Sequence, residues 1–274
     1  MRMLLSLVFI FLSMDASYAH EKEISVYDKV LKSGKIKCGY TLYSVGLNRD
    51  LKTGELWGIY KDLVEEIGNK LDLEIEWTEE VGWGQQIEGL NTGRYDMVCS
   101  PANITAPRAK SADMISPFYF SPVWIWVRSD DTRFDNKGRD IMNDPSFKVS
   151  VMDGEQSEAQ ADFYLPNASK FSIPQSSSFS SLLLNVTTGK GDIAFAEPTS
   201  VYEFMENNPD GLKKVAGDKP LYLAGNIMLI KRGEHDFRRM IDNVMKDLLL
   251  SGSIDKIIDK FEKYPNSYIR AKGY

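Results

Sequence analysis

Histidine and cysteine are scarce in this sequence, and their scarcity excludes several kinds of chemistry. Of 274 residues, two are cysteines and two are histidines. His20 and His235 lie far along the chain from Cys38 and Cys99, so the sequence supports neither a zinc site nor a Cys–His nucleophile. We therefore expect no metal ion and no cofactor.

An excess of positive charge is also lacking. Acidic residues outnumber basic ones by 39 to 33, which gives a formal net charge of -6. A protein without a basic field has little with which to neutralise phosphates, so we expect no nucleic-acid partner. Small anionic ligands stay possible, because they respond to a local site.

Long apolar runs are missing as well, apart from one near the start. Residues 3–14 are almost unbroken apolar, after the positive start Met1-Arg2, and small residues precede Ala19. The run is short for a membrane span of about 20 residues. This pattern predicts a signal peptide over residues 1–19, cleaved after Ala19, and a periplasmic protein. An uncleaved anchor is the alternative.

The first half of the remaining chain alternates between the patterns of strands and helices. We expect strands at residues 35–40, 73–77 and 97–100, with helices at residues 60–71 and 81–94. This order is typical of a parallel sheet whose faces are covered by helices.

A charged segment, residues 128–145, then predicts a connector or the exposed edge of a second lobe. A second alternation follows it, with three strands, three helices, a longer apolar strand and two C-terminal helices. The expected strands are 148–152, 170–173, 192–196 and 221–230, and the helices begin near residues 157, 178, 198, 236 and 253.

Cys38 and Cys99 each fall inside an expected strand. An oxidising compartment permits a disulfide between them if the strands are neighbours and the Cα atoms lie within about 7 Å. Two separate buried thiols are the alternative.

A polar stretch follows the strand at residues 97–100, and it contains the arginine Arg108. Open α/β sheets bind ligands at such strand ends. The two parallel N–H donors of a guanidinium match a carboxylate. Arg108 is thus a candidate for binding a carboxylate, against the alternative of a surface arginine.

Five segments of the chain resemble one known family. They are residues 54–63 (GELWGIYKDL), residues 83–96 around the Gly93-Arg94-Tyr95-Asp96 turn, residues 105–119 (TAPRAK…SPFY), residues 189–197 (GKGDIA…E) and residues 250–264 (LSGSIDKIIDKFEKY). In this order and spacing they are similar to the periplasmic solute-binding proteins of family 3, which serve amino-acid ABC importers. The resemblance runs from about residue 35 to residue 264.

The resemblance implies an α/β, two-lobed type II periplasmic binding protein fold. Each lobe would be a mostly parallel sheet flanked by helices, and two crossover strands would join them. Lobe 1 would comprise residues 20–126 and 223–274, and lobe 2 residues 127–222. The family's mechanism is hinge closure on a small solute, which a monomer would deliver to a membrane permease.

The resemblance also assigns candidate ligand-binding residues. Arg108 matches the family's arginine for the ligand α-carboxylate, and Glu197 matches its acid for the α-ammonium. Thr105 lies near the arginine and would shape the turn. Asn103 stands where the family usually has a serine or threonine hydroxyl, and it can offer donor and acceptor groups.

Glu155 and Gln156 replace a familiar Gly-Thr-Thr run at the start of a lobe-2 helix, where N–H groups normally meet an anion. Glu155 would either cap that helix or face the cleft and favour cationic ligands. Tyr40 and Tyr43 lie where the family places a stacking aromatic residue. Trp83 would line the cleft or pack in the core, and Trp124 has the same two interpretations.

Two other functions stay open at this stage. Some relatives on this scaffold are exported dehydratases that act on cyclohexadienyl acids, for which Glu197 or Glu155 would be the acid. A sensing or accessory module that binds a receptor and no nutrient would have a filled or collapsed cleft. The leading expectation is a binding protein without enzymatic activity.

Overall fold

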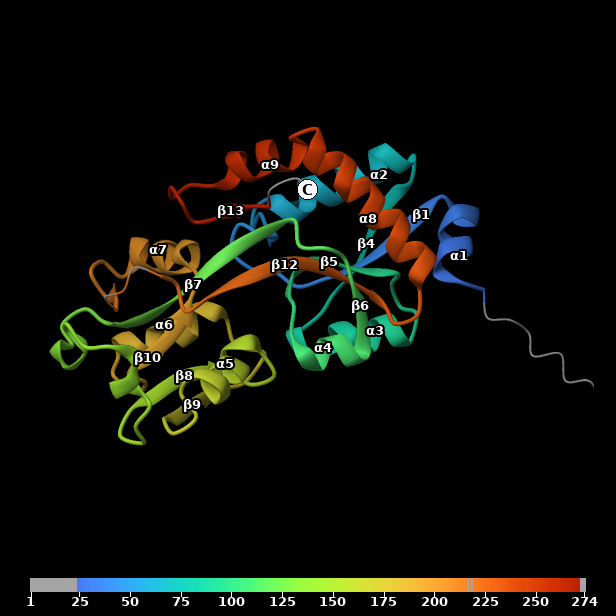
Figure 1. The fold of residues 1–274 in the computed structure, drawn as a ribbon. Coiled ribbons are helices and arrows are strands. Elements are labelled where there is room, and N and C mark those ends of the chain that lie inside the picture. Colours follow the sequence, from blue (N-terminus) through green and yellow to red (C-terminus); the bar gives the residue numbers. More distant parts are fainter. Residues whose placement is uncertain (1–23, 216, 218, 272–274) are drawn as a thin grey trace, which may run out of the picture.

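The computed structural model describes residues 24–215, 217 and 219–271. The predicted signal peptide, residues 1–19, and its cleavage point after Ala19 lie outside these residues. Two lobes lie side by side, and two long strands pass between them (Figure 1). This two-lobed α/β architecture confirms the fold expected from the sequence.

The first lobe is built on parallel strands that lie next to one another in the order β4-β1-β5. Their bounds are Glu74–Glu80 for β4, Lys35–Tyr40 for β1 and Met97–Asn103 for β5. The helices of this lobe are α1 (Val26–Ser33), α2 (Ile59–Leu71), α3 (Gln86–Asn91), α4 (Ala106–Ser111), α8 (His235–Leu250) and α9 (Ser253–Phe261). One hydrophobic core joins residues from both ends of the described chain, from Val30 to Tyr268.

The second lobe carries the parallel strands β10 (Ile193–Ala196), β8 (Lys148–Met152) and β9 (Ser169–Ile173). Its helices are α5 (Gln156–Tyr164), α6 (Phe179–Thr187) and α7 (Pro198–Asn207). Two separate hydrophobic cores fill this lobe.

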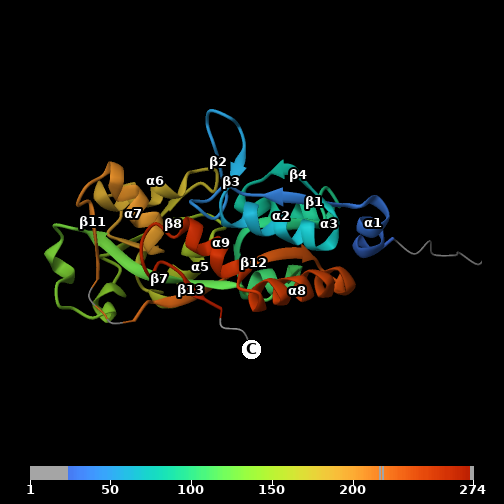
Figure 2. The same ribbon diagram turned by 90° about the horizontal axis from the view of Figure 1, so that it is seen from above.

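The lobes are joined by β7 (Tyr119–Arg128) and β12 (Tyr222–Lys231), which pair antiparallel with each other. Strand β7 continues into the second lobe by pairing with β10, while β12 pairs with β5 in the first lobe. Short strands lie on these two: β6 (Ala112–Met114), β11 (Leu212–Lys214) and β13 (Ile269–Arg270). The hairpin β2 (Asn48–Arg49) and β3 (Leu56–Trp57) projects from the body near the junction of the lobes (Figure 2).

Two expected elements differ in detail. The helix expected over residues 81–94 is a 3-10 turn, η1 (Trp83–Gln85), followed by the short helix α3, and Gly93 follows with a φ of 70°. The charged segment 128–145 forms the 3-10 turns η2 (Thr132–Phe134) and η3 (Arg139–Met142). Phe134 and Met142 anchor it, because both are buried in a core of the second lobe.

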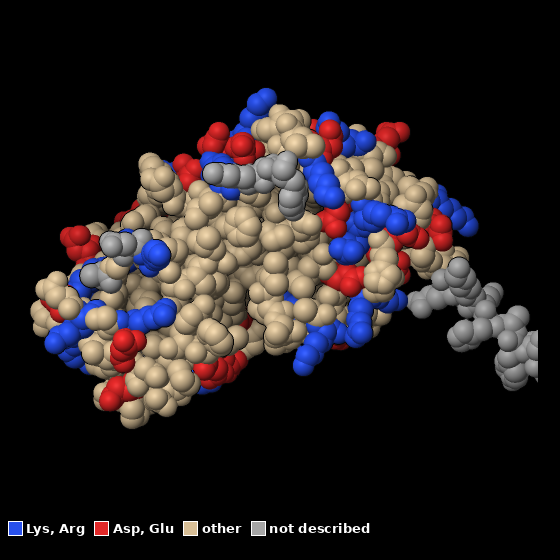
Figure 3. All heavy atoms as spheres, viewed as in Figure 1, with Lys and Arg blue, Asp and Glu red and all other residues tan. Residues whose placement is uncertain are grey.

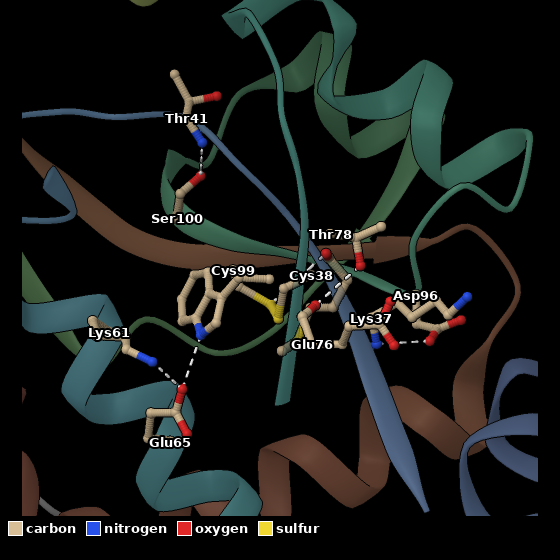
Figure 4. Close-up of a disulfide and its surroundings, with 12 residues drawn as sticks. Lys37, Cys38, Thr41, Lys61, Glu65, Glu76, Thr78, Asp96, Cys99 and Ser100 are labelled. Atoms are coloured by element: carbon tan, nitrogen blue, oxygen red, sulfur yellow. Dashed lines mark hydrogen bonds and ion pairs between the residues drawn. A yellow bond between two sulfur atoms is a disulfide. The ribbon is translucent and has the colours of Figure 1, made fainter. Parts of the chain in front are cut away.

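Cys38 and Cys99 form a disulfide, with their Cα atoms 5.4 Å apart. Their strands β1 and β5 are parallel neighbours, so the two side chains meet inside the first lobe (Figure 4). Of the two alternatives for these cysteines, the structure therefore has the disulfide. It links segments that carry the strand ends of the first lobe.

Charges of both signs are interspersed around the rim of the face in Figure 3, and the belt between the lobes on that face is largely uncharged. None of the helices in the described part of the chain is long and apolar enough to cross a membrane.

Candidate functional site

A cavity lies where the two lobes face each other. Its walls come from the end of β5, from α4 and η1 in the first lobe, and from α5, α6 and the end of β10 in the second lobe. The cavity has a volume of about 40 Å³. Its charged lining residues are Arg108, Glu155 and Glu197. The site therefore combines one guanidinium with two carboxylates.

Helix α4 holds Arg108 at the cavity. The side chain of Thr105 caps this helix by accepting a hydrogen bond from the Arg108 backbone N–H, at 3.3 Å. The Arg108 guanidinium donates from Nη1 to the carbonyl oxygen of Asn103, at 3.1 Å. Burial lowers the pKa of Arg108, and the negative charge of Glu155 raises it by a smaller amount. The arginine stays cationic at neutral pH.

Arg108 makes no salt bridge with any residue in the described part of the chain. A half-buried guanidinium without a carboxylate partner keeps most of its fork of N–H donors open. It is thus suited to bind an anionic group of a ligand by donating hydrogen bonds to it.

Asn103 and Gln156 meet across the cleft. Asn103 ends β5 in the first lobe, Gln156 begins α5 in the second, and the Asn103 amide donates to the Gln156 side-chain oxygen. Both residues line the cavity. Their side chains therefore satisfy each other and link the two lobes beside the cavity.

Glu155 has both of the roles considered from the sequence. It caps α5, since its carboxylate accepts a hydrogen bond from the Ser157 backbone N–H at 2.7 Å, and it also lines the cavity. One carboxylate oxygen is sufficient for the cap. Its negative charge consequently lies beside the cleft.

Glu197 lies between β10 and α7, where Pro198 begins the helix. Burial raises the pKa of the Glu197 carboxyl to about 7, with smaller contributions from the charges of Glu155 and Glu203, while a hydrogen bond from Ser121 acts in the opposite direction. A carboxylate in such surroundings gains from a cationic partner. At neutral pH the site can thus hold a proton or attract an ammonium group.

Aromatic rings form one wall of the cavity. Tyr43 lies edge-on to Trp83 and Phe179, with ring centroids 5.6 and 5.4 Å away. These three residues and Tyr222 line the cavity. Trp83 also packs against a core of the second lobe, so it has both of the positions considered for it.

Tyr40 and Thr105 lie outside the lining of the cavity. Tyr40 is not among the cavity-lining residues: it is buried in the first lobe, packs edge-on against Trp77 and accepts a hydrogen bond from Arg49 at 2.7 Å. Thr105 acts through the helix cap and borders a neighbouring pocket. Trp124 packs against the core of the second lobe, with Lys214 over its ring.

Several lining residues were not identified from the sequence. They are mainly Phe179, Tyr222, Gln160 and Asn226. Phe179 begins α6 and Tyr222 begins the crossing strand β12, so both reach the site from elements that read as ordinary core segments. For Phe179 the sequence offers one signal, which is its position at the start of an expected helix, directly after Ser178.

A row of contacts joins helix α7 to the first lobe. Ser200 shares a hydrogen bond with the Tyr43 hydroxyl at 3.0 Å, and Glu203 accepts one from Ser44 at 2.7 Å. Glu206 accepts hydrogen bonds from Lys263 and Tyr264. We call these contacts the α7 clamp. The clamp begins three residues after Glu197, so the acid of the site stands at the start of the helix that makes these contacts between the lobes, α7.

Among the residues that the structure describes, no group of acidic, histidine or cysteine side chains could hold a metal ion. The arrangement is one of binding groups between two lobes: a guanidinium without a salt bridge to any described residue, a protonatable carboxylate and aromatic rings. Fold and site together define a two-lobed periplasmic-type solute-binding protein.

Comparison with known proteins agrees with that class. Residues 37–263 match the model of the bacterial extracellular solute-binding proteins, family 3, and the chain belongs to this family. One relative is the amino-acid-binding protein AabA of Dichelobacter nodosus, 21% identical over 78% of this chain and 81% of that protein. A probable histidine-binding protein of Campylobacter jejuni is 24% identical over 76% of this chain and 77% of that protein.

Among solved structures, the ancestral amino-acid-binding protein AncCDT-1, described as a precursor of cyclohexadienyl dehydratase, superposes with a TM-score of 0.74. It is 24% identical and the match covers 88% of this chain and all of that one. This likeness shows a shared fold. Membership of a family of extracellular solute-binding proteins indicates that the chain binds a solute.

Proposed function

We propose that this protein captures an amino acid or a related zwitterion in the periplasm and delivers it to the permease of an ABC importer. The observation that carries this proposal is that Arg108 and Glu197 line one cavity from different lobes. Arg108 comes from the first lobe and has no ion-pair partner among the described residues, and Glu197 comes from the second. An α-carboxylate matches the first group and an α-ammonium the second.

Closure of the lobes supplies the mechanism. A cavity of about 40 Å³ holds on the order of one or two water molecules, so an amino acid enters when the lobes are apart. A solute that contacts both lobes then stabilises the closed form, because it makes all its contacts in that form alone. We place the hinge in β7 and β12, with the lobes divided near residues 126–127 and 222–223.

The charges and rings of the site favour a zwitterion whose side chain is apolar or cationic. Glu155 and Glu197 outweigh Arg108, and the aromatic wall of Tyr43, Trp83 and Phe179 suits apolar or cationic parts of a ligand. Delivery by a monomer, exported after cleavage at Ala19, completes the proposal.

The direct test is native mass spectrometry of freshly purified protein, followed by calorimetry with the solute that is found. We expect a bound mass of an amino acid and binding of that compound by the emptied protein. Protein that carries no small solute, and that binds no member of a complete panel of amino acids and polyamines, would contradict the proposal.

An exported dehydratase is the second candidate, and the pKa of Glu197 favours it. A carboxylic acid with a pKa of about 7 is suited to donate a proton near neutral pH. Conversion of prephenate or arogenate by the wild-type protein, lost in Glu197→Gln, would establish this activity. Absence of turnover would remove it.

A further inference from the structure

A second, larger chamber adjoins the ligand cavity. It has a volume of about 630 Å³ and lies between the segment that follows β1 and the helices α6 and α7. Six serines line it: Ser44, Ser177, Ser178, Ser180, Ser181 and Ser200. Its charged lining residue is Glu203, and among its described lining residues there is no lysine, arginine or histidine. The chamber is therefore polar and carries a negative charge.

The chamber and the cavity share a wall. Tyr43, Trp83 and Phe179 line both spaces. We call these three residues the aromatic collar. A solute whose charged ends lie at Arg108 and Glu197 fills the small cavity with its α-carbon groups. Its side chain consequently needs other space, and the chamber of about 630 Å³ lies on the other side of the collar.

A second exit is less suitable for a polar side chain. A pocket of about 300 Å³ lies beyond Gln156, Gln160 and Tyr222. It is bordered by the exposed apolar side chains of Phe163 and Leu223, and also by Thr105, which caps the helix of Arg108. A carboxylate held by Arg108 lies toward that side, so the other end of the solute points toward the collar.

Glu203 is placed to receive the end of such a side chain. It lies on α7, six residues after Glu197, and is half-buried. Ser44 donates one hydrogen bond to its carboxylate at 2.7 Å, while Lys263, the cation nearest in the clamp, is paired with Glu206. No described cation forms a salt bridge with Glu203. Burial raises the pKa of this carboxyl, as is expected for a charge that lacks a partner.

We propose that Glu203 determines specificity by pairing with the cationic end of a long ligand side chain, so that the solute is a basic amino acid such as one with a guanidinium or ammonium group. This inference rests on the proposed function. The side chain passes the aromatic collar, where flat rings favour a cation, and ends among the serine hydroxyls beside Glu203.

Calorimetry with L-arginine and L-citrulline tests the inference, because the two have nearly the same shape and differ in the charge of the side chain. A hydrogen-bonded charge pair in such a site corresponds to a preference of about 10- to 100-fold. We expect the wild-type protein to prefer arginine by that factor. Glu203→Gln should remove most of the preference while the affinity for citrulline changes by less than about threefold.

Glu206→Gln is the matched control, since it lies on the same helix but outside the chamber lining. It should change both affinities together and leave their ratio intact. Unchanged thermal melting of Glu203→Gln shows that the variant is folded.

Other results would overturn the inference. Equal binding of arginine and citrulline by the wild-type protein would do so, as would a preference that survives in Glu203→Gln or one that Glu155→Gln alone removes. In these cases amino acids still bind and the proposed function stands. If no amino acid binds, both proposals fail.

Discussion

Replacement of Glu197 by glutamine should stabilise the unliganded protein at pH 8 and have little effect at pH 4. The cause is the pKa of the Glu197 carboxyl, which burial raises from an ordinary 4.5 to about 7 in the folded protein. Between these values the folded state binds more protons than the unfolded state. The free energy of unfolding therefore falls as the pH rises through this window.

The size of the effect follows from the two pKa values. A difference from 4.5 to about 7 corresponds to about 3 kcal/mol at a pH above both, because each pKa unit represents about 1.4 kcal/mol. The wild-type protein bears this cost fully near pH 8 and loses it as the pH falls toward 4.5. Glu197→Gln carries no charge at any pH and so avoids it.

Urea denaturation of both proteins at several pH values between 4 and 8 measures the difference directly. Glu206→Gln is a matched control, because hydrogen bonds from Lys263 and Tyr264 lower the pKa of Glu206. This substitution should therefore not stabilise the protein at pH 8. A difference between wild type and Glu197→Gln that is constant across this range would refute the reasoning.

An α-ammonium beside Glu197 should also displace its proton, so solute binding near pH 6.5 should release protons in calorimetry.

The remaining predictions concern the covalent and non-covalent links in the fold. Replacing Cys38 and Cys99 by alanine should lower the free energy of unfolding by about 4 kcal/mol, given the loop of 61 residues that the disulfide closes; equal stability of the reduced and oxidised proteins in urea would contradict this. The double variant Glu206→Gln, Tyr264→Phe should weaken the α7 clamp, so that the unliganded protein has a larger radius of gyration in X-ray scattering and binds its solute a few-fold more weakly. An unchanged radius together with unchanged affinity would show that these contacts do not hold the lobes closed.

Much of the fold was accessible from sequence because periodicity and motif order are local. The two α/β alternations and the positions of Arg108 and Glu197 depend on short segments, and the structure places both residues at one cavity. Glu155 was ambiguous for a physical reason: a carboxylate at a helix start can cap and face a cleft at once.

Long-range packing determines the positions that local sequence patterns do not predict. Tyr40 was expected at the cleft, but its ring turns into the first lobe toward Trp77 and its hydroxyl meets Arg49. Phe179 and Tyr222 line the cavity together with residues of the first lobe such as Tyr43. The chamber beside Glu203 is formed by segments about 150 residues apart, Ser44 and α7, which no local pattern brings together.

The central claim is that Arg108 binds the carboxylate of the solute between the lobes. Calorimetry of Arg108→Gln with the solute that the wild-type protein retains tests it most directly. Arg239→Gln is the control, because Arg239 is an exposed arginine paired with Asp236 far from the cavity. We predict a loss of at least about 100-fold for Arg108→Gln, as expected when a buried charge pair is broken, and no change for Arg239→Gln. Retention of wild-type affinity by Arg108→Gln would contradict the account.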